Sequence, residues 1–337
     1  MITSKQKEAA VELAKILNIP PGFILQALLM IEKKTAYWIG HIPKESGGER
    51  QIQAARRPLN IIQTRIASII YGQSVSEISH GFVAGRSHRT AILPHLWAKA
   101  FFTFDIKDAF PSTSRKQVQF SLRKIGWQIG FGEEVADLMT ELVCYSPTGK
   151  LEDGFLPLGY TSSPYIFNLV LKDIDQILLH FAQKRGYQIS RYVDNFAIST
   201  TERTIPEMER RTAIKTVESL SLDRYKIPEE KTSYREAHGK DVHFEFLGLV
   251  IEETEDGERV INVAEEKLGE CVWIILGALE EKDFSESTFR TIRGKINYLT
   301  SVYRRQGRPL PAEISELFAK YKSMRNSQSY FKTDQLV

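Results

Sequence analysis

The chain contains few cysteines, no long apolar run and no marked excess of charge of one sign. Its 337 residues include only two cysteines, Cys144 and Cys271, which lie far apart and without a CxxC spacing. That pattern excludes a disulfide framework and a zinc knuckle. The apolar runs are too short, or too often broken by charge, to span a bilayer. No N-terminal segment has the pattern of an export signal, so we expect a cytoplasmic protein with no membrane partner.

The net charge is only +3, which does not by itself indicate a nucleic-acid partner. The basic residues are nevertheless clustered beside glycine and proline residues. The clusters are Arg50 with Arg56 and Arg57, Arg86 with His88 and Arg89, and Arg304 with Arg305 and Arg308. Clustering of this kind modestly favours a polyanionic ligand over a solvated face.

Hydrophobic periodicity predicts helices and strands in mixed order. The expected helices lie near residues 9–17, 22–33, 59–69, 88–95, 114–125, 133–145, 166–178, 206–220, 263–280, 286–303 and 311–323. The expected strands lie near 101–106, 189–192, 196–199 and 244–251, with turns at 46–48, 194–195 and 256–257. Strands enclosed by helices, followed by a helical C-terminal part, make an α+β protein.

Two aspartates occupy positions where a carboxylate is costly to bury. Asp105 ends the apolar strand 101–106, and Asp194 lies on the expected hairpin turn. Either one alone could simply cap a helix or a turn, but an aspartate flanked by apolar strand residues needs a partner or a cation. Two carboxylates on adjacent strands would hold divalent ions about 3.5–4 Å apart. Oxygen ligands favour Mg²⁺, and we expect two such ions, with Mn²⁺ as a substitute.

The motifs around these aspartates resemble, in order, those of bacterial reverse transcriptases. The similar segments are Arg50, Ile52, Leu59 and Gln63; His80-Gly81-Phe82 with Gly85-Arg86-Ser87; Leu156-Pro157-Leu158-Gly159 with Ser163-Pro164 and Asn168; Glu230-Lys231-Thr232; Phe246-Leu247-Gly248; and Gly294 to Leu299. Each segment is short, but together they are collinear over residues 45–300. The chain is most similar to retron, abortive-infection and other defence-associated enzymes, and it shares palm motifs with group II intron enzymes.

The resemblance implies a right-hand polymerase fold with fingers, an antiparallel palm sheet and a helical thumb. On that basis we expect N-terminal helices and fingers at residues 1–100. The palm would cover 101–262, with an insertion between fingers and palm near 114–155. The thumb would cover 263–325, and residues 326–337 would form a flexible tail.

The resemblance also implies roles at the reaction centre. Asp105 and Asp194 would bind the metal ions, with the carbonyl of Ile106 assisting, and Asn195 would complete the catalytic turn. Lys231 would donate a proton to the departing pyrophosphate, unless it is only a surface lysine.

A second group of residues is implied to bind the incoming nucleotide. Arg50, with Arg56 or Arg57, would clamp its triphosphate, because a planar guanidinium binds phosphate oxygens in pairs. For Arg56 and Arg57 a solvated basic turn is the alternative. Phe110 would stack beneath the sugar and exclude a 2′-hydroxyl, which would make DNA the product, unless the ring only packs in the core. Leu158–Gly159 would shape the floor beneath the templating base pair.

Contacts with nucleic acid complete the implied site. Arg86 and Ser87 would contact nucleic acid, and Phe246-Leu247-Gly248 would hold the primer end. Charged and aromatic surface for a duplex backbone would come from Arg293, Lys295, Tyr298 and Arg304, although Tyr298 could equally be a core residue.

The chain departs from the family pattern in three motifs. The turn reads Tyr-Val-Asp-Asn, so that Asn195 stands where most members have a second aspartate. Leu158 stands where most have glutamine, which removes a polar contact near the template. Of the Asn-Ala-x-x-His signature of many retron enzymes, only His95 is present. We expect activity with an altered metal preference or rate, because Asp194 is present.

Three functions are open on the sequence alone. The first is RNA-templated DNA synthesis in bacterial antiviral defence, which uses deoxynucleoside triphosphates, an RNA template such as a cognate noncoding RNA, and a partner protein or a homo-oligomer. The second is template-independent or low-complexity DNA synthesis, primed from protein. The third is a catalytically weakened nucleic-acid-binding or assembly subunit, which Asn195 and Leu158 favour and the paired aspartates disfavour.

Overall fold

The computed structural model describes residues 2–43, 47–73, 75–239 and 241–333. Helices and strands occur in separate groups along the chain, and the paired strands are antiparallel, which confirms the α+β class. The chain forms two compact units. The first comprises Met1–Ser87, Phe102–Ser199 and Ile205–Tyr234, and the second comprises His88–Phe101, Thr200–Thr204 and Arg235–Val337. None of the helices among the described residues combines the length and the apolar character needed to cross a membrane.

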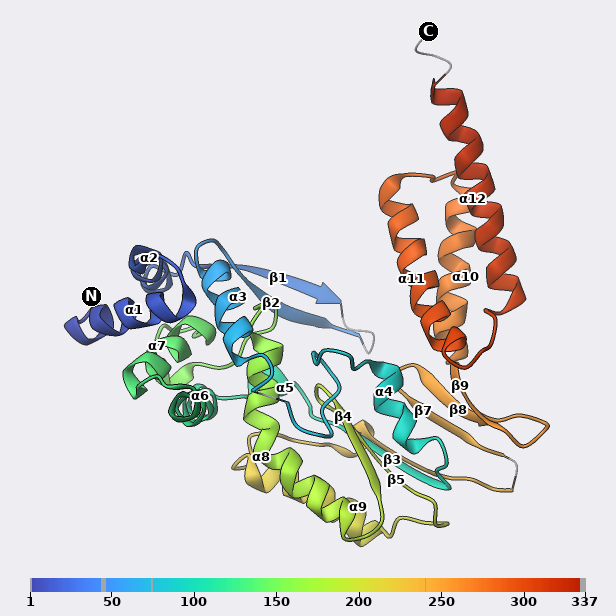
Figure 1. The fold of residues 1–337 in the computed structure, drawn as a ribbon, viewed down its shortest axis with the longest axis horizontal. Coiled ribbons are helices and arrows are strands. Elements are labelled where there is room, and N and C mark those ends of the chain that lie inside the picture. The colour runs from blue at the N-terminus through green and yellow to red at the C-terminus, as the bar shows by residue number, and fades with distance from the viewer. Residues whose placement is uncertain (1, 44–46, 74, 240, 334–337) are drawn as a thin grey trace. The chain divides into compact units, whose positions relative to one another are not determined.

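The first unit opens with helices and a two-stranded ribbon, drawn in blue in Figure 1. These elements are α1 (Ser4–Leu17), α2 (Pro21–Glu32), β1 (Tyr37–Pro43), β2 (Glu49–Ala55) and α3 (Leu59–Ile70). A capping box between Thr3 and Gln6 starts α1, because it satisfies free amides of the first turn. Strands β1 and β2 are antiparallel, and their register places Arg50 opposite Ile42.

Two amphipathic helices occupy the region expected to be an insertion. They are α6 (Arg115–Ile129) and α7 (Glu133–Val143), and the short α5 (Ala109–Ser112) precedes them. Ser114 caps α6 through a capping box with Gln117, and Gly130 ends the helix in the left-handed conformation. The apolar stripes of α6 and α7 pack against each other, and α7 also packs against α1.

A four-stranded sheet provides the framework for the candidate site. Its strands are β3 (Ala100–Asp105), β4 (Gln188–Tyr192), β5 (Asn195–Thr200) and β6 (Thr232–Glu236). The strand order is β4–β5–β3–β6, and β4 and β5 form an antiparallel hairpin. The buried rings of Phe104 and Phe196 stack with their centroids 4.8 Å apart. This contact holds β3 against β5 and so fixes the ends of both strands.

Two helices pack beside this sheet. They are α8 (Ser163–Gln183), which contacts β4, and α9 (Glu207–Leu220), which contacts α8. Pro164 lies in the first turn of α8, where its missing amide proton costs nothing. Most of the buried face of α8 is apolar, but Asn168 and Asp175 are also buried there. Because buried polar groups need partners, these two residues mark a polar network inside the first unit.

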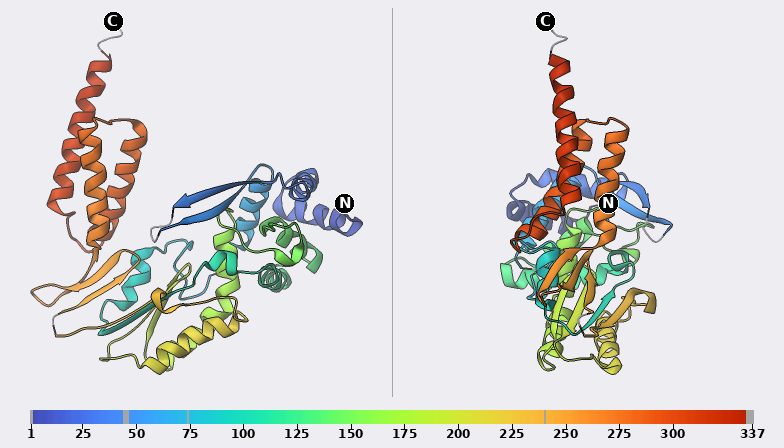
Figure 2. Two further views of the ribbon diagram at one scale, coloured as in Figure 1. Left: turned by 180° about the vertical axis from the view of Figure 1, so that it is seen from behind. Right: turned by 90° about the vertical axis from the view of Figure 1, so that its right-hand side faces the viewer.

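The second unit contains a three-stranded antiparallel sheet and three long helices that lie side by side in Figures 1 and 2. The elements are α4 (His88–Ile92), β7 (His243–Phe246), β8 (Leu249–Glu253), β9 (Arg259–Val263), α10 (Glu265–Glu280), α11 (Glu286–Arg304) and α12 (Ala312–Thr333). Helix α10 packs against both α11 and α12, and α4 packs against β8.

Single-turn 3₁₀ helices occur in both units, at Leu93–His95 in the second and at Leu151–Asp153 and Glu229–Lys231 in the first.

Most expected elements are confirmed, but three expectations are wrong. The hairpin turn is Val193–Asp194 and not 194–195, because Asn195 already pairs with Tyr192. The expected strand 244–251 is a hairpin, since both Leu247 and Gly248 have a positive φ that reverses the chain.

The third correction concerns the C-terminal end. The helix expected near residues 311–323 is longer than expected, because α12 continues to Thr333 and no glycine or proline ends it earlier. That residues 326–337 form a flexible tail stays a prediction. Residues 46 and 334–337 of the expected turn and tail lie outside the described residues. The boundaries of fingers, palm and thumb stay predictions.

Candidate active site

The end of β3 lies beside the turn that joins β4 to β5. The amide of Ile106 donates a hydrogen bond to the carbonyl of Asp194 across 3.2 Å. This bond connects the residue that follows Asp105 to the residue on the turn. The two aspartates expected to form the site therefore lie together, although the chain separates them widely.

Burial and like charge both act on the carboxyl of Asp194. Burial first, and then the negative charge of Asp105, raise the pKa of Asp194 from 3.8 to about 6. A backbone hydrogen bond, the cationic Arg50 and a 3.1 Å hydrogen bond from Asn195 Nδ2 to Asp194 Oδ1 oppose the rise. Two neighbouring carboxylates with limited access to solvent are a favourable place for a cation to bind.

Lys231 supplies one positive charge to this site. Its Nζ donates to Asp105 Oδ2 across 2.7 Å, and both side chains are partly exposed. The hydrogen bond to Asp105 raises the pKa of Lys231, so that the ammonium form is favoured. The sequence analysis expects Lys231 to donate a proton. In the structure this lysine is bonded to Asp105, one of the two residues expected to bind metal.

The other oxygen of Asp105 has the character of a metal ligand. Its Oδ1 is buried and lacks a hydrogen-bond partner among the described residues, which is costly for a carboxylate. Within the part of the chain that the structure describes, no group of three or more His, Cys, Asp or Glu side chains could hold a metal. Further oxygens would therefore come from the Ile106 carbonyl, water or substrate phosphates. The residues fit Mg²⁺, which is usually bound by a few carboxylates together with phosphates.

The three arginines expected to bind the triphosphate differ in whether they interact with this site. Arg50 on β2 is exposed, and its charge acts on both Asp194 and Lys231. Arg56 and Arg57 follow directly after β2. For these two residues the structure shows no contact with the aspartates.

Phe110 lies just past Asp105, at the start of α5. Its ring is half-buried and stacks on Phe167 of α8, with centroids 5.0 Å apart. Phe167 in turn lies edge-on to the buried Tyr225. This support fixes the ring of Phe110 while leaving part of it accessible.

The loop that contains Leu158 and Gly159 packs on β2. The amide of Gln53 donates to the carbonyl of Leu158 across 2.7 Å. Gly159 has φ +96°, and a Cβ at this position would come within 2.6 Å of the Gln53 carbonyl oxygen. Glycine is therefore required for the loop to approach the strand that carries Arg50.

The residues expected at the primer lie in the second unit. Leu247 and Gly248 form the two-residue turn between β7 and β8, and Phe246 is buried against Phe101. A positive φ at both central residues is the geometry that the right-handed twist of a tight hairpin prefers.

A cavity of about 370 Å³ opens beside this turn. It is lined by Leu247, by Lys267, Glu270 and Cys271 of α10, by Lys295, Tyr298 and Leu299 of α11, and by His88. Lys295 donates to Glu270 across 2.8 Å, and the ring of Tyr298 lies edge-on to His88. Arg293 and Arg304, also on α11, are exposed.

Arg86, expected to contact nucleic acid, is used inside the first unit. Its Nη1 donates to the carbonyls of Ser76 and Glu77 at 2.9 Å each, and also to that of Ser79. Ser87 is half-buried at the end of the same segment. The structure thus gives Arg86 a role in shaping the chain before it, and its contact with nucleic acid stays a prediction.

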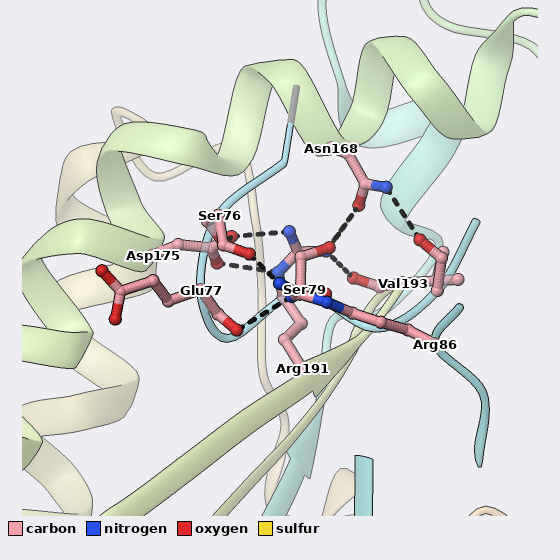
Figure 3. A network of polar contacts seen from close by, with 9 residues as sticks. Ser76, Glu77, Ser79, Arg86, Asn168, Asp175, Arg191 and Val193 are labelled. Atoms are coloured by element: carbon pink, nitrogen blue, oxygen red, sulfur yellow. Dashed lines mark hydrogen bonds and ion pairs between the residues drawn. The ribbon is translucent and has the colours of Figure 1, made fainter. Parts of the chain in front are cut away.

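Sequence reasoning named Asn168 as part of a motif but missed Arg191 and Asp175, which hold the turn that carries Asp194. Arg191, Asp175 and Asn168 form a buried polar network directly behind Val193 (Figure 3). The available signal was an arginine inside a short strand and an aspartate on the apolar face of a long helix. Only a folded arrangement shows that the two belong together.

A comparison with protein-family models matches residues 42–251 to the family described as reverse transcriptase (RNA-dependent DNA polymerase). The chain belongs to the reverse transcriptase family. Its α+β arrangement is accordingly that of the right-hand polymerase fold, and the resemblance inferred from its motifs is confirmed.

Curated relatives of the chain are retron members of that family. The retron Mx65 reverse transcriptase of Myxococcus xanthus is 30% identical over 59% of this chain and 48% of its own length. The retron Ec86 reverse transcriptase of Escherichia coli is 26% identical over 81% of this chain and 78% of its own length. Among solved structures, telomerase from Candida albicans with a fragment of telomeric RNA has a TM-score of 0.49 at 12% identity, over 86% of this chain and 56% of that one. The match to Mx65 thus spans about half the length of that relative.

The Asp194→Asn substitution should stabilise the protein in the absence of metal. Because folding raises the pKa of Asp194 from 3.8 to about 6, the folded state keeps a proton between these values that the unfolded state has released. Wild-type stability should therefore fall as the pH rises through this window and stay lower above it. At about 1.4 kcal/mol per pKa unit, the Asp194→Asn variant should gain up to about 3 kcal/mol at neutral pH.

Urea unfolding in EDTA, followed from acid to mildly alkaline pH, measures this gain. The control is Asp256→Asn, which changes an exposed carboxyl on the turn between β8 and β9. Equal stability of wild type and Asp194→Asn at every pH would contradict the expectation.

The Gly159→Ala substitution should destabilise the first unit by about 1–3 kcal/mol, because it adds both backbone strain and overlap with Gln53. Gly186→Ala is the matched control, since Gly186 has φ +69° but no atom within 4 Å of an added Cβ. Urea unfolding of the two variants separates overlap from strain. If both variants lose the same stability, close packing of this loop on β2 is not the reason for glycine.

Proposed function

We propose that this chain is an RNA-directed DNA polymerase that joins deoxynucleotides at the site formed by Asp105 and Asp194. The observation that carries the proposal is the pairing of these two carboxylates at the end of β3, with a buried oxygen of Asp105 that lacks a partner among the described residues. Burial without a hydrogen-bond partner is costly for a carboxylate oxygen, and a bound cation would remove that cost.

The two aspartates would hold Mg²⁺, and two ions would suit a site that faces a triphosphate, with Mn²⁺ as a substitute. When bound, the ions would activate the primer hydroxyl and neutralise charge on the phosphates. In the joining step the primer 3′-hydroxyl loses its proton to water, its oxygen forms a bond to the α-phosphorus, and the bond between the α-phosphorus and pyrophosphate breaks. Arg50 would bind the triphosphate, and Lys231 would donate a proton to the leaving pyrophosphate once Asp105 binds a metal ion.

Asn195 has a definite role in this scheme. Its amide donates to Asp194 and so stabilises the charged form of that carboxyl. A second aspartate at this position would instead add a negative charge beside Asp105 and Asp194. We infer that the site works with two carboxylates, and that the substitution affects metal preference or rate.

Leu158 favours a second candidate function. Its carbonyl is engaged by Gln53, and its side chain offers no hydrogen bond to a template or a nucleotide. Template-independent or low-complexity DNA synthesis would tolerate that loss better than templated synthesis. The product sequence decides between the two functions.

The named relatives support a biological setting. Because they are retron reverse transcriptases, we infer that a cognate noncoding RNA is the template and that the chain acts in antiviral defence. A partner protein or a second copy of the chain would complete such a system.

A direct test measures incorporation of deoxynucleotides with Mg²⁺ on an RNA template, followed by sequencing of the products. Asp105→Asn and Asp194→Asn should each reduce the rate by about a thousandfold, since a metal ion contributes several kcal/mol to transition-state stabilisation. The exposed Asp256→Asn should leave it unchanged. Products that copy the RNA support the proposal, and products independent of it support the second function. A silent wild type across templates and nucleotides would favour the non-catalytic subunit.

Phe110→Ala should relax the selection against ribonucleotides. Removing the ring that Phe167 supports opens space beneath the sugar, and the preference for deoxynucleotides should fall by about 10- to 100-fold. The ratio of kcat/KM for deoxy- and ribonucleotides measures it. The control is Phe120→Ala, which removes an exposed ring on α6. An unchanged ratio in the Phe110 variant would show that its ring only packs against Phe167.

A further inference from the structure

We propose that Arg191, held by Asp175, is a positioning residue that fixes the turn carrying Asp194. The inference rests on the proposed function, because it concerns the geometry of the same metal-binding pair. It assigns a role to two buried charges that lie outside the site itself.

Arg191 and Asp175 form a bidentate ion pair inside the first unit. Arg191 Nε lies 2.7 Å from Asp175 Oδ1, and Arg191 Nη2 lies 2.6 Å from Asp175 Oδ2. Both side chains are 0% exposed. Asp175 comes from α8 and Arg191 from β4, so this pair fixes the strand to the helix (Figure 3).

The third nitrogen of the guanidinium reaches the catalytic turn. Arg191 Nη1 donates to the carbonyl of Val193 across 2.6 Å and to Asn168 Oδ1 across 3.0 Å. Val193 is the residue immediately before Asp194. The rigid guanidinium of Arg191 thus connects Asp175 and Asn168 on α8 to the turn that carries Asp194.

The turn needs such support because its backbone is strained. Val193 has φ +58°, a left-handed conformation that is a true outlier for a β-branched residue. The turn also meets Gly81, where an added Cβ would come within 2.8 Å of the Val193 amide nitrogen. The carbonyl of Gly81 in turn accepts from Asn168 Nδ2 across 2.9 Å. Val193 is therefore in contact with both the Gly81 segment and the guanidinium.

The segment that contains Gly81 is fixed by the same network. The hydroxyl of Ser79 donates to Asn168 Oδ1, and that of Ser76 to Asp175 Oδ2. Arg86 binds three carbonyls of residues 76–79, as described above. The network seen in Figure 3 therefore fixes the segment that contains Ser76, Ser79 and Gly81. Arg191 connects the turn to both Asn168 and Asp175 on α8.

Stability alone does not explain a charged pair at this place. A buried ion pair is often no more stabilising than apolar side chains of equal volume. An apolar pair could fill the space, but it could not donate to the Val193 carbonyl. Lysine could neutralise Asp175, but a single ammonium lacks the planar fork needed to bind Asp175 and Val193 together.

The test compares two ways of removing the guanidinium of Arg191. Arg191→Lys keeps the charge opposite Asp175, whereas Arg191→Met with Asp175→Leu removes both charges and leaves none unpaired. The control is Arg123→Met with Asp137→Leu, which removes a bidentate but partly exposed pair between α6 and α7.

Three measurements follow the position of the turn. The first is exchange of the Ile106 amide hydrogen, which donates to the Asp194 carbonyl and should exchange faster in both Arg191 variants. The second is Mn²⁺ binding to the nucleotide-free protein by electron paramagnetic resonance, which should weaken about 10- to 100-fold, as is usual when a residue that orients a metal ligand is lost. The third is the kinetics of incorporation, in which kcat should fall while KM for the nucleotide changes little.

The results distinguish a positioning role from a structural one. If the Arg191 variants unfold at a lower temperature but keep wild-type Ile106 exchange and Mn²⁺ binding, the pair only stabilises the fold and the proposal is wrong. If the double variant does not fold, Arg191→Lys gives the same comparison. If wild type makes no DNA, the proposed function fails, but exchange and Mn²⁺ binding still decide the role of Arg191.

Discussion

The site depends on an arrangement that electrostatics opposes, namely two carboxylates brought together with little solvent. The fold imposes it through the backbone: β3 and β5 are neighbours in one sheet, the Phe104–Phe196 stack holds them in register, and the Ile106 amide binds the Asp194 carbonyl. The raised pKa of Asp194 expresses the cost of this arrangement. Lys231 and Arg50 reduce that cost without satisfying every oxygen, and the remaining oxygen of Asp105 is what suits the site to a divalent cation.

Directly behind the carboxylates lie a residue with a strained backbone and the side chains that hold it. Val193 adopts a backbone conformation that valine avoids, and the Arg191–Asp175 pair and Gly81 hold it there. A similar arrangement occurs in the loop at Gly159, where a missing side chain lets the chain approach β2, the strand of Arg50. In both places a small residue permits close packing, and a hydrogen bond to a carbonyl fixes the result.

The departures from the family pattern have local explanations. Asn195 replaces a negative charge with a hydrogen-bond donor to Asp194, which changes the balance of charge while keeping the paired aspartates. Leu158 keeps the main-chain bond to Gln53 that positions the loop and loses only a polar side chain. Neither change disturbs the backbone on which the proposed chemistry depends.

The sequence by itself determined the α+β class, most helices, the strand that ends at Asp105 and the family, because these follow from periodicity and from short motifs in a fixed order. It misplaced the turn at 194–195 and read the hairpin at Leu247–Gly248 as one strand, since a positive φ in valine or leucine has no pattern of its own. It also missed Arg191 with Asp175, because nothing in the two segments indicates that these charges meet. Only the tertiary structure decided these points, because a buried charge acquires its meaning from a partner that the chain brings to it from elsewhere.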